Sequence, residues 1–386
     1  MARVIYLFKG KFPWDGRLVK ICTSLQKAGN EVLVVARAKN NQNRTRQWNN
    51  LKIWYACASI PTILSTPYPN NPFWISDLKK IFSEFNPDLI IVRDFFLVKA
   101  TRKALASNSI PIVIDMAEHY PSAMREWEKY KRNPVAKFLI NNLKLIDKWE
   151  AECVGNSDAI ITVCDEQKER LVAQYSYPEN KIEIVYNTPE LNQFARIERR
   201  QKSSPRVFIH HGFHTSEKPI DKFLEYFIDC ALEEKGFKFI IAGAGDCIPR
   251  LKKIVEQKEA KNVIFTGYYD FEQLPYILQN ADIGVIPYPP NDFNNHTLHN
   301  KVFDYLAAGI PILVSEAKPL KRLVFETNAG VSIPIERENL CQFFATIDKY
   351  NWNEMSQNAI KHSRKKYNWE VDEKKLIRFL ETVLYG

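Results

Sequence analysis

The sequence predicts an α/β protein with two domains, each a doubly wound parallel β-sheet covered by helices. Short runs of β-branched residues alternate with segments of helical period, as parallel βαβ units require. This alternation is lost once near the middle of the chain and then starts again. With 386 residues, the chain is long enough for two such domains.

The first half opens with a strand, a turn and a helix. Residues 4–8 form an apolar β-branched run, and the segment 17–28 places Leu18, Ile21 and Leu25 on one helix face before Gly29 ends the helix. Further strand-like runs follow at 32–36, 52–55, 89–92, 112–114 and 160–163.

The pattern stops at residues 187–190 and again at 196–205, where Arg, Gln, Ser and Pro replace periodic apolar residues. We predict an N-terminal domain over residues 1–190, a linker over 191–205, a C-terminal domain over 206–365, and a last helix over 366–386 that packs on either domain. In the C-terminal domain we expect strands at 207–210, 237–242, 263–266, 283–287 and 311–315, and helices at 219–235, 249–259, 271–279 and 301–308.

Composition narrows the class of protein. Apolar runs fall far short of the roughly 20 residues that a membrane span needs, and residues 1–8 are typical of a first strand rather than a signal peptide. Seven cysteines without a C-x-x-C pair are typical of small buried residues in a reducing compartment, so we expect a cytoplasmic protein. The net charge of +9 suits nucleic acid, an anionic membrane or a phosphorylated substrate, and does not choose among them.

The segment 300–315 carries the most chemical information. Asn300 is placed to cap a short helix that ends at Gly309, and Lys301 and Asp304 are three residues apart, so they share one helix face. A carboxylate there accepts hydrogen bonds from two vicinal hydroxyls, as a ribose presents, while the start of the helix favours a phosphate. The alternative is that Lys301 and Asp304 form an ordinary exposed ion pair.

The sequence Asn-Lys-Val-Phe-Asp-Tyr-Leu-Ala-Ala-Gly-Ile-Pro-Ile over residues 300–312 resembles the donor-site helix of the retaining group 1 glycosyltransferases, also called family 4. The resemblance implies the GT-B fold, in which two Rossmann-like domains face each other across a cleft. It also implies a nucleoside-diphosphate sugar as co-substrate, retention at the anomeric carbon, and neither a cofactor nor an obligatory metal. Further segments support it in order along the chain, at 15–17, 114–121, 159–165, 184–187, 212–218 and 241–245.

The resemblance assigns roles to particular residues. It implies catalytic roles for His119, Glu118, Lys218 and Lys301, with Glu118 and His119 as alternatives for handling the proton of the acceptor hydroxyl. The donor-binding residues that it implies are Gly16, Gly212, Lys218, Gly243, His296, Asn300, Lys301 and Asp304.

Two positions depart from the family pattern. Phe213 stands after Gly212 where the family often has arginine, and His296 stands eight positions before Asp304, where the family has an acidic residue that contacts the donor sugar. Lys218 and Lys301 are then the cations expected for the leaving diphosphate.

The sequence also bears on whether the protein binds a metal, a membrane or nucleic acid. Histidines cluster at 210–214 and 296–299 without a cysteine or carboxylate at a usual ligand spacing, and no D-x-D motif occurs, so we expect no metal. The basic and aromatic stretch 125–149 is either a contact with an anionic membrane face or a solvated amphipathic helix. No recognition motif accompanies the basic charge, so we expect no nucleic-acid binding.

We therefore expect a retaining glycosyltransferase that moves a sugar from a nucleotide donor, with UDP as the working nucleotide, to a glycan or lipid-linked hydroxyl acceptor in cell-surface polysaccharide or glycolipid synthesis. Two alternatives are a sugar-nucleotide epimerase of the same fold and a catalytically degenerate nucleotide-binding subunit.

Overall fold

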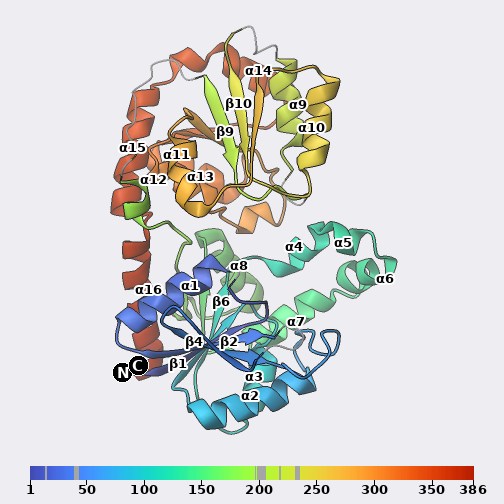
Figure 1. Cartoon of the computed structure of the whole chain (residues 1–386), viewed down its shortest axis with the longest axis vertical. Coiled ribbons are helices and arrows are strands. Elements are labelled where there is room, and N and C mark those ends of the chain that lie inside the picture. The colour runs from blue at the N-terminus through green and yellow to red at the C-terminus, as the bar shows by residue number, and fades with distance from the viewer. Residues whose placement is uncertain (14, 39–42, 196, 198–205, 217–218, 231–234) are drawn as a thin grey trace. The chain divides into compact units, whose positions relative to one another are not determined.

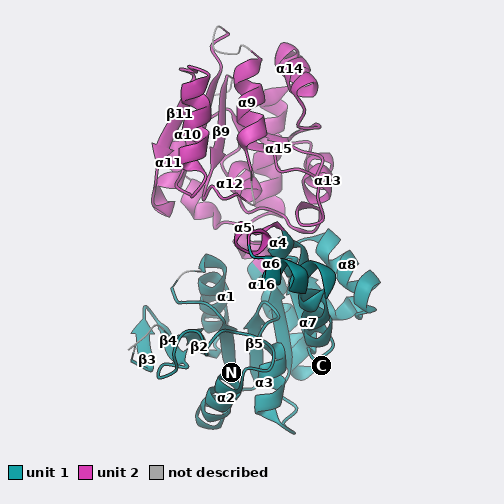
Figure 2. Cartoon of the chain, turned by 90° about the vertical axis from the view of Figure 1, so that its right-hand side faces the viewer, with its two compact units in different colours: residues 1–125, 133–185, 373–386 teal, residues 126–132, 186–372 magenta. Residues whose placement is uncertain are grey.

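The computed structural model describes residues 1–386 with the exception of 14, 39–42, 196, 198–205, 217–218 and 231–234. The chain divides into two compact units (Figure 2). Unit 1 comprises residues 1–125, 133–185 and 373–386, and unit 2 comprises residues 126–132 and 186–372. Each unit contains one sheet with helices packed on it, so the predicted class of two α/β domains is confirmed.

The sheet of unit 1 has eight strands in the order β3-β4-β2-β1-β5-β6-β7-β8. Its strands are β1 (Arg3–Phe8), β2 (Glu31–Arg37), β3 (Thr45–Trp48), β4 (Leu51–Ala56), β5 (Leu89–Arg93), β6 (Ile112–Met116), β7 (Ala159–Thr162) and β8 (Ile182–Ile184). All neighbours pair in parallel except β3, which runs antiparallel to β4 at the sheet edge. The central strands are buried on both faces, which explains their continuous apolar runs.

The helices of unit 1 connect these strands. They are α1 (Gly16–Lys27), α2 (Pro72–Phe85), α3 (Val98–Leu105), α4 (Tyr120–Glu126), α6 (Pro134–Lys137), the π-helix η1 (Phe138–Asn142), α7 (Leu145–Val154) and α8 (Asp165–Tyr175), with the single turn η2 (Glu179–Lys181). The first follows the prediction: Leu18, Ile21 and Leu25 are buried, and Gly29 has a φ of 85° just beyond the helix end. Asp15 starts this helix by accepting hydrogen bonds from the backbone N–H groups of Arg17 and Leu18.

The sheet of unit 2 has six parallel strands in the order β11-β10-β9-β12-β13-β14. They are β9 (Val207–His211), β10 (Lys238–Ala242), β11 (Val263–Gly267), β12 (Ile283–Ile286), β13 (Ile312–Val314) and β14 (Gly330–Ser332). The helices are α5 (Glu128–Lys131), α9 (Asp221–Asp229), α10 (Ile248–Gln257), α11 (Leu274–Leu278), α12 (Lys301–Ala307), α13 (Lys318–Thr327), α14 (Arg337–Ala345) and α15 (Trp352–Lys365), with the short turns η3 (Leu191–Phe194), η4 (Phe271–Gln273), η5 (Asn294–His296) and η6 (Ile347–Lys349).

The unit 2 helices form two groups. Helices α9, α10 and α14 pack together on one side of the sheet, and α12, α13 and α15 pack together on the other (Figure 1). The first group rests on an aromatic core in which Phe208, Phe227 and Phe344 meet with ring centroids 5.4–5.9 Å apart.

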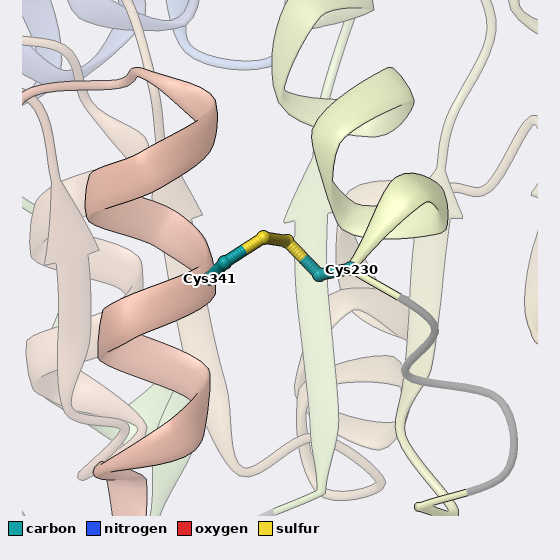
Figure 3. The surroundings of a disulfide bond; sticks show 2 residues. All are labelled: Cys230 and Cys341. Carbon is teal, nitrogen blue, oxygen red and sulfur yellow. A yellow bond between two sulfur atoms is a disulfide. The ribbon is translucent and has the colours of Figure 1, made fainter.

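A disulfide joins two helices of the first group. Cys230, the residue that ends α9, is bonded to Cys341 in α14, with the Cα atoms 5.5 Å apart (Figure 3). The expectation that all seven cysteines are free is therefore wrong for this pair. The two residues are 111 positions apart in sequence, and only the packing of α9 on α14 brings them together. The inference of a reducing compartment from cysteine usage loses its basis with this bond.

The boundary between the units falls at residues 185 and 186, and residues 191–194, which we expected in a linker, form η3 within unit 2. The last helix, α16 (Trp369–Tyr385), is divided: its residues up to Asp372 belong to unit 2 and the rest to unit 1. Within unit 2, the start of α16 is held by Asp372, whose carboxylate accepts a hydrogen bond from the hydroxyl of Thr188. None of the helices in the described part of the chain combines the length and the apolar character that a membrane span requires.

Candidate functional site

Two loops meet backbone to backbone at the carboxyl edge of the unit 2 sheet. One follows β9 and contains Gly212 and His214, and the other follows β10 and contains Gly243 and Gly245. A Cβ atom on Gly243 would lie 2.0 Å from the carbonyl oxygen of Gly212, and one on Gly245 would lie 2.0 Å from that of His214. Glycine is therefore required at both positions of the second loop, and the first loop presents its backbone at the edge where α/β sheets bind ligands.

Helix α12 places a lysine beside this backbone. Tyr305 donates a hydrogen bond from its hydroxyl to the carbonyl oxygen of Ile209 in β9 (3.0 Å), which fixes α12 against the sheet. Lys301, at the start of α12, donates to the hydroxyl of Tyr288 (2.7 Å). Its Nζ atom lies 3.7 Å from the position that a Cβ atom on Gly212 would take. A cation is thus held beside the half-buried backbone of the first loop at Gly212.

Asp304 lies on the same helix, one turn after Lys301. It is only 8% exposed, which excludes the solvated surface ion pair that was the alternative interpretation of this residue. Its Oδ2 atom lies 3.7 Å from Nε2 of His211, whose Nδ1 atom is hydrogen-bonded to the hydroxyl of Tyr269 (3.1 Å). The sequence analysis missed Tyr269 and Tyr288. Tyr288 follows the buried strand β12, whereas Tyr269 follows β11, whose residues are mostly exposed.

Three further residues were expected to bind the donor, and the structure describes Asn300 and His296 among them. Asn300 was expected to cap α12, but its backbone is helical and its side chain makes no capping hydrogen bond, because the side chain of a capping residue reaches back only from an extended backbone. His296 lies in η5, with its Nδ1 atom 2.8 Å from the carbonyl oxygen of Asp292 and 3.3 Å from its carboxylate. Lys218 lies outside the residues that the structure describes.

Three histidines line this edge in an uncharged form. His210, His211 and His214 are 1%, 4% and 2% exposed. Burial, reinforced by the neighbouring charge of Lys301, holds the pKa of His210 and of His211 well below its usual value. The same causes lower the pKa of His214 to about 4, although its hydrogen bond to the carbonyl oxygen of Ala242 works in the opposite direction.

The carboxyl edge of the unit 1 sheet carries a buried ion-pair network. Arg17 is 2% exposed, and its guanidinium contacts the carboxylate of Asp115 at 2.8–3.2 Å and the carbonyl oxygen of Val185 at 2.9 Å. Arg93 pairs with Asp15 at 2.9 Å. Burial alone would raise the pKa of Asp115, but the two guanidinium groups outweigh it and lower that pKa. The Asp15-Gly16-Arg17 segment therefore holds unit 1 together through its two charged side chains.

Lys9 sits beside this network. Its ammonium group contacts Asp94 at 2.6 Å and lies 4.1 Å and 4.0 Å from the ring centres of Phe96 and Tyr120. Tyr120 donates to the same carboxylate (2.7 Å), and Asp94 has a φ of 62°, a left-handed conformation that costs energy outside glycine. The sequence analysis missed Lys9 and Asp94, although Lys9 directly follows β1 and Asp94 directly follows β5.

The other unit 1 residues lie near the same edge. His119 and Glu118 follow β6 and precede α4; His119 is buried at 5% exposure, and Glu118 is half-buried. Gly16 is the first residue of α1, and a Cβ atom there would meet nothing within 4 Å among the described residues. No described group lies close enough to Gly16 to exclude a side chain at this position.

Comparison with protein families identifies the chain. Residues 17–192 match the model described as Glycosyltransferase Family 4, and residues 205–349 match the model described as Glycosyl transferases group 1. Among curated relatives, an uncharacterised glycosyltransferase of Methanocaldococcus jannaschii is 26% identical over 243 residues, which cover 59% of this chain and 60% of the relative. TuaH, a Bacillus subtilis glycosyltransferase named for teichuronic acid biosynthesis, is 27% identical over 194 residues, 48% of each protein. The matched part thus spans about half to three fifths of these relatives.

Solved structures share the fold over the whole chain. Sucrose-phosphate synthase from Thermosynechococcus elongatus superposes with a TM-score of 0.74 at 13% identity and covers 99% of both chains. HepE of Anabaena, solved in complex with UDP, superposes with a TM-score of 0.66 at 12% identity and covers 98% of this chain and all of that one. The chain belongs to the family 4, or group 1, glycosyltransferases and has their GT-B fold.

Proposed function

We propose that this chain transfers a sugar from a nucleoside-diphosphate sugar to a hydroxyl group of an acceptor. The observation that carries the proposal is the pairing on α12 of a lysine and a buried carboxylate. Lys301 is fixed over the backbone of Gly212, where a diphosphate needs a cation and hydrogen-bond donors, and Asp304 follows one turn later, where a ribose needs an acceptor for its two hydroxyls.

Lys301 has the chemistry to assist departure of the nucleoside diphosphate. As the glycosidic bond to the donor breaks, negative charge grows on the leaving phosphate, and a fixed cation stabilises it more than it stabilises the ground state. The hydrogen bond to Tyr288 holds the ammonium group in place before the reaction. We propose that Lys301, together with Lys218, supplies the charge that a divalent metal supplies in other glycosyltransferases.

We assign the acceptor to the carboxyl edge of unit 1. Glu118 and His119 follow β6 there, and either side chain has the chemistry to take the proton of the attacking hydroxyl. Retention at the anomeric carbon is part of the proposal because family membership implies it. The UDP complex of HepE supports UDP as the nucleotide of the donor. The name of TuaH supports a cell-surface glycan as the product.

We further propose that the segment 133–148 of unit 1 touches an anionic membrane face. The observation that favours it is that both apolar and basic residues are exposed in the consecutive elements α6, η1 and the start of α7. Val135 and Phe138 are 68% and 53% exposed, and Lys137, Lys144 and Lys148 of the same segment are exposed as well. This combination suits insertion at a lipid headgroup boundary that carries negative charge.

A donor panel tests the proposed reaction. UDP-, GDP- and ADP-linked sugars are first screened by thermal shift, since a ligand at a hundred times its Kd stabilises the folded protein by about 2.7 kcal/mol. Donors that bind are then incubated with and without acceptor, and release of the nucleoside diphosphate is measured. Lys301→Met is expected to lose most of this turnover, whereas Lys253→Met, which removes an exposed lysine of α10, is the matched control.

The outcomes of this assay separate the alternatives. Release of nucleoside diphosphate that depends on acceptor supports transfer. Conversion of the donor to its epimer without acceptor identifies an isomerase, and binding without any turnover identifies a nucleotide-binding subunit. Either of the last two results would overturn the proposed function.

A further inference from the structure

We propose that the three histidines at the carboxyl edge of unit 2 form a proton-accepting subsite for the donor diphosphate, so that binding of the donor takes up a proton from solvent. The inference rests on the proposed function for the identity of the ligand. It assigns to His210, His211 and His214 a share of the counter-charge that the family usually draws from an arginine after the loop glycine, a position occupied here by Phe213.

The hydrogen bonds around His210 define where its proton lies. Lys301 donates to the hydroxyl oxygen of Tyr288, so the Tyr288 hydroxyl donates in turn to Nε2 of His210 (2.9 Å). The neutral His210 ring then carries its hydrogen on Nδ1. That Nδ1 atom is buried and has no hydrogen-bond partner among the described residues. A buried N–H group without an acceptor is costly and is expected to find one when ligand binds.

The ring of His214 has the opposite arrangement. Its Nε2 atom lies 3.1 Å from the carbonyl oxygen of Ala242, and because a carbonyl only accepts, the hydrogen of the neutral ring is on Nε2. Its buried Nδ1 atom carries a lone pair and has no hydrogen-bond partner in the described part of the chain. The ring centre is 5.0 Å from that of His210. A proton added to Nδ1 turns this atom into a charged donor beside the loop of Gly212.

His211 completes the group. Its Nδ1 atom is bonded to Tyr269, and its Nε2 atom has no hydrogen-bond partner among the described residues, although Asp304 lies 3.7 Å away. Its ring also stands edge-on against the ring of Tyr305, with the centres 5.0 Å apart. Proton uptake on His211 would therefore create an ion pair with Asp304 at the edge where the ribose and diphosphate are proposed to lie.

The charges that face these rings explain why an anion is the trigger. Lys301 from α12 disfavours a proton on all three rings, and the neighbouring imidazoles, including His299 before α12, disfavour it on His210. On the side of β10, Cys247 follows the second loop and burial raises the pKa of its thiol to about 11, so it stays uncharged at neutral pH. A diphosphate beside Lys301 cancels the repulsion and attracts protons to the same rings.

The consequence is a pH-dependent affinity. If one proton is taken up, Kd for the donor weakens by up to about tenfold for each unit of rising pH between the lowered pKa of the free imidazole and its raised pKa in the complex. Outside this window the bound and free forms are equally protonated and Kd does not change with pH. A nucleoside-diphosphate sugar is the probe, because its diphosphate is a diester that does not titrate near neutral pH, whereas a free nucleoside diphosphate does.

Two measurements test the inference on the intact protein. Calorimetry at pH 7 in buffers of different ionisation enthalpy counts the protons taken up with each donor that binds. NMR of the histidine Cε1–H signals, recorded from pH 5 to 8 with and without sulfate, follows each imidazole directly, since sulfate is an anion that does not titrate in this range. We expect about one proton taken up, and a raised pKa for at least one of the three histidines.

Isosteric variants locate the effect while preserving the hydrogen bonds. His210→Gln and His214→Gln keep a polar atom at the Nε2 position, and His211→Asn keeps one at the Nδ1 position, but none of these side chains accepts a proton near neutral pH. His362→Gln in α15 is the matched control. We expect the control to bind with unchanged proton uptake and at least one site variant to lose it, with the thermal unfolding midpoint reporting whether each variant is folded.

Failure of this inference is separable from failure of the proposed function. Donor binding with no proton uptake and no change in histidine pKa overturns the inference and leaves the proposed function intact. Raised histidine pKa values with sulfate, but no binding of any nucleotide sugar, support the anion subsite and count against the proposed function. No response to either probe overturns the subsite outright.

Discussion

The replacement Asp304→Asn is the most direct test of where the donor sits. Asparagine has nearly the same shape as aspartate, so α12 is expected to remain folded, held by the hydrogen bond from Tyr305 to β9. The amide nitrogen, however, cannot accept a hydrogen bond, and the negative charge is lost. A ribose that offers two hydroxyl donors to the carboxylate therefore loses at least one good acceptor.

The magnitude follows from the burial of this carboxylate. A hydrogen bond to a charged group contributes about 1.5–3 kcal/mol, which corresponds to a roughly ten- to hundredfold weaker Kd. Asp304 is only 8% exposed, so water cannot easily replace it as the partner of the ribose hydroxyls. We expect the upper part of this range for the donor and for the free nucleoside diphosphate alike.

A double-mutant cycle isolates the contact. Calorimetry compares ribonucleotide and 2′-deoxyribonucleotide on the natural protein and on Asp304→Asn; the deoxy ligand is expected to bind poorly to the first and to lose little more on the second. Glu256→Gln, an exposed acid-to-amide change in α10, is the control. If the folded Asp304→Asn protein bound the ribonucleotide with unchanged affinity, Asp304 would not contact ribose and the placement of the donor on α12 would be refuted.

Three further predictions concern metal, membrane and the disulfide. Turnover is expected to persist in EDTA, because lysines take the charge-stabilising part of a metal; activity that is abolished by chelator and restored by Mg²⁺ or Mn²⁺ would contradict this. The intact protein is expected to co-sediment with anionic vesicles in a salt-sensitive manner and to lose much of this binding in Phe138→Ser or Lys137→Glu, while equal binding to neutral and anionic vesicles would exclude the proposed membrane face. Reduction of the Cys230–Cys341 bond, which joins residues 111 positions apart, is expected to destabilise unit 2 by up to about 4–5 kcal/mol. Reductant should therefore lower the unfolding midpoint of the natural protein but not that of a Cys230→Ala, Cys341→Ala variant. Equal midpoints of the natural protein with and without reductant would show that the bond adds no stability.

The strands were predictable because most of them are buried on both faces. A strand such as β5 must then be a continuous apolar run, and its bounds differ by only one residue from the run read in the sequence. The antiparallel edge strand β3 was missed because it lacks this burial. Its residues, Thr45 to Trp48, are mostly exposed, so no apolar pattern marks them.

The candidate sites were predictable only in part, because charged residues read alike in sequence whatever they contact. Lys301 and Asp304 were selected as candidates through a motif with a fixed spacing, and the structure places both on α12. Arg17, next to the expected donor-binding residue Gly16, is instead buried in an ion pair with Asp115, a residue 98 positions away. Distances of that kind follow from strand order in the sheet, which the local sequence does not specify. The Cys230–Cys341 pair escaped prediction for the same reason.

The charge balance at the two sheet edges gives a physical reason to assign the diphosphate to unit 2. In unit 1, Arg17 and Arg93 face the carboxylates of Asp15 and Asp115 inside the protein, so an incoming anion would have to compete with partners that are already in place. In unit 2, Lys301 donates to the hydroxyl of Tyr288, which is neutral, and we propose that the surrounding histidines add positive charge when the donor binds. An anion bound there is attracted by a lysine whose hydrogen bond to Tyr288 is to an uncharged group, so the placement of this one lysine is a better guide to the site than the formal charge of +9 spread over the sequence.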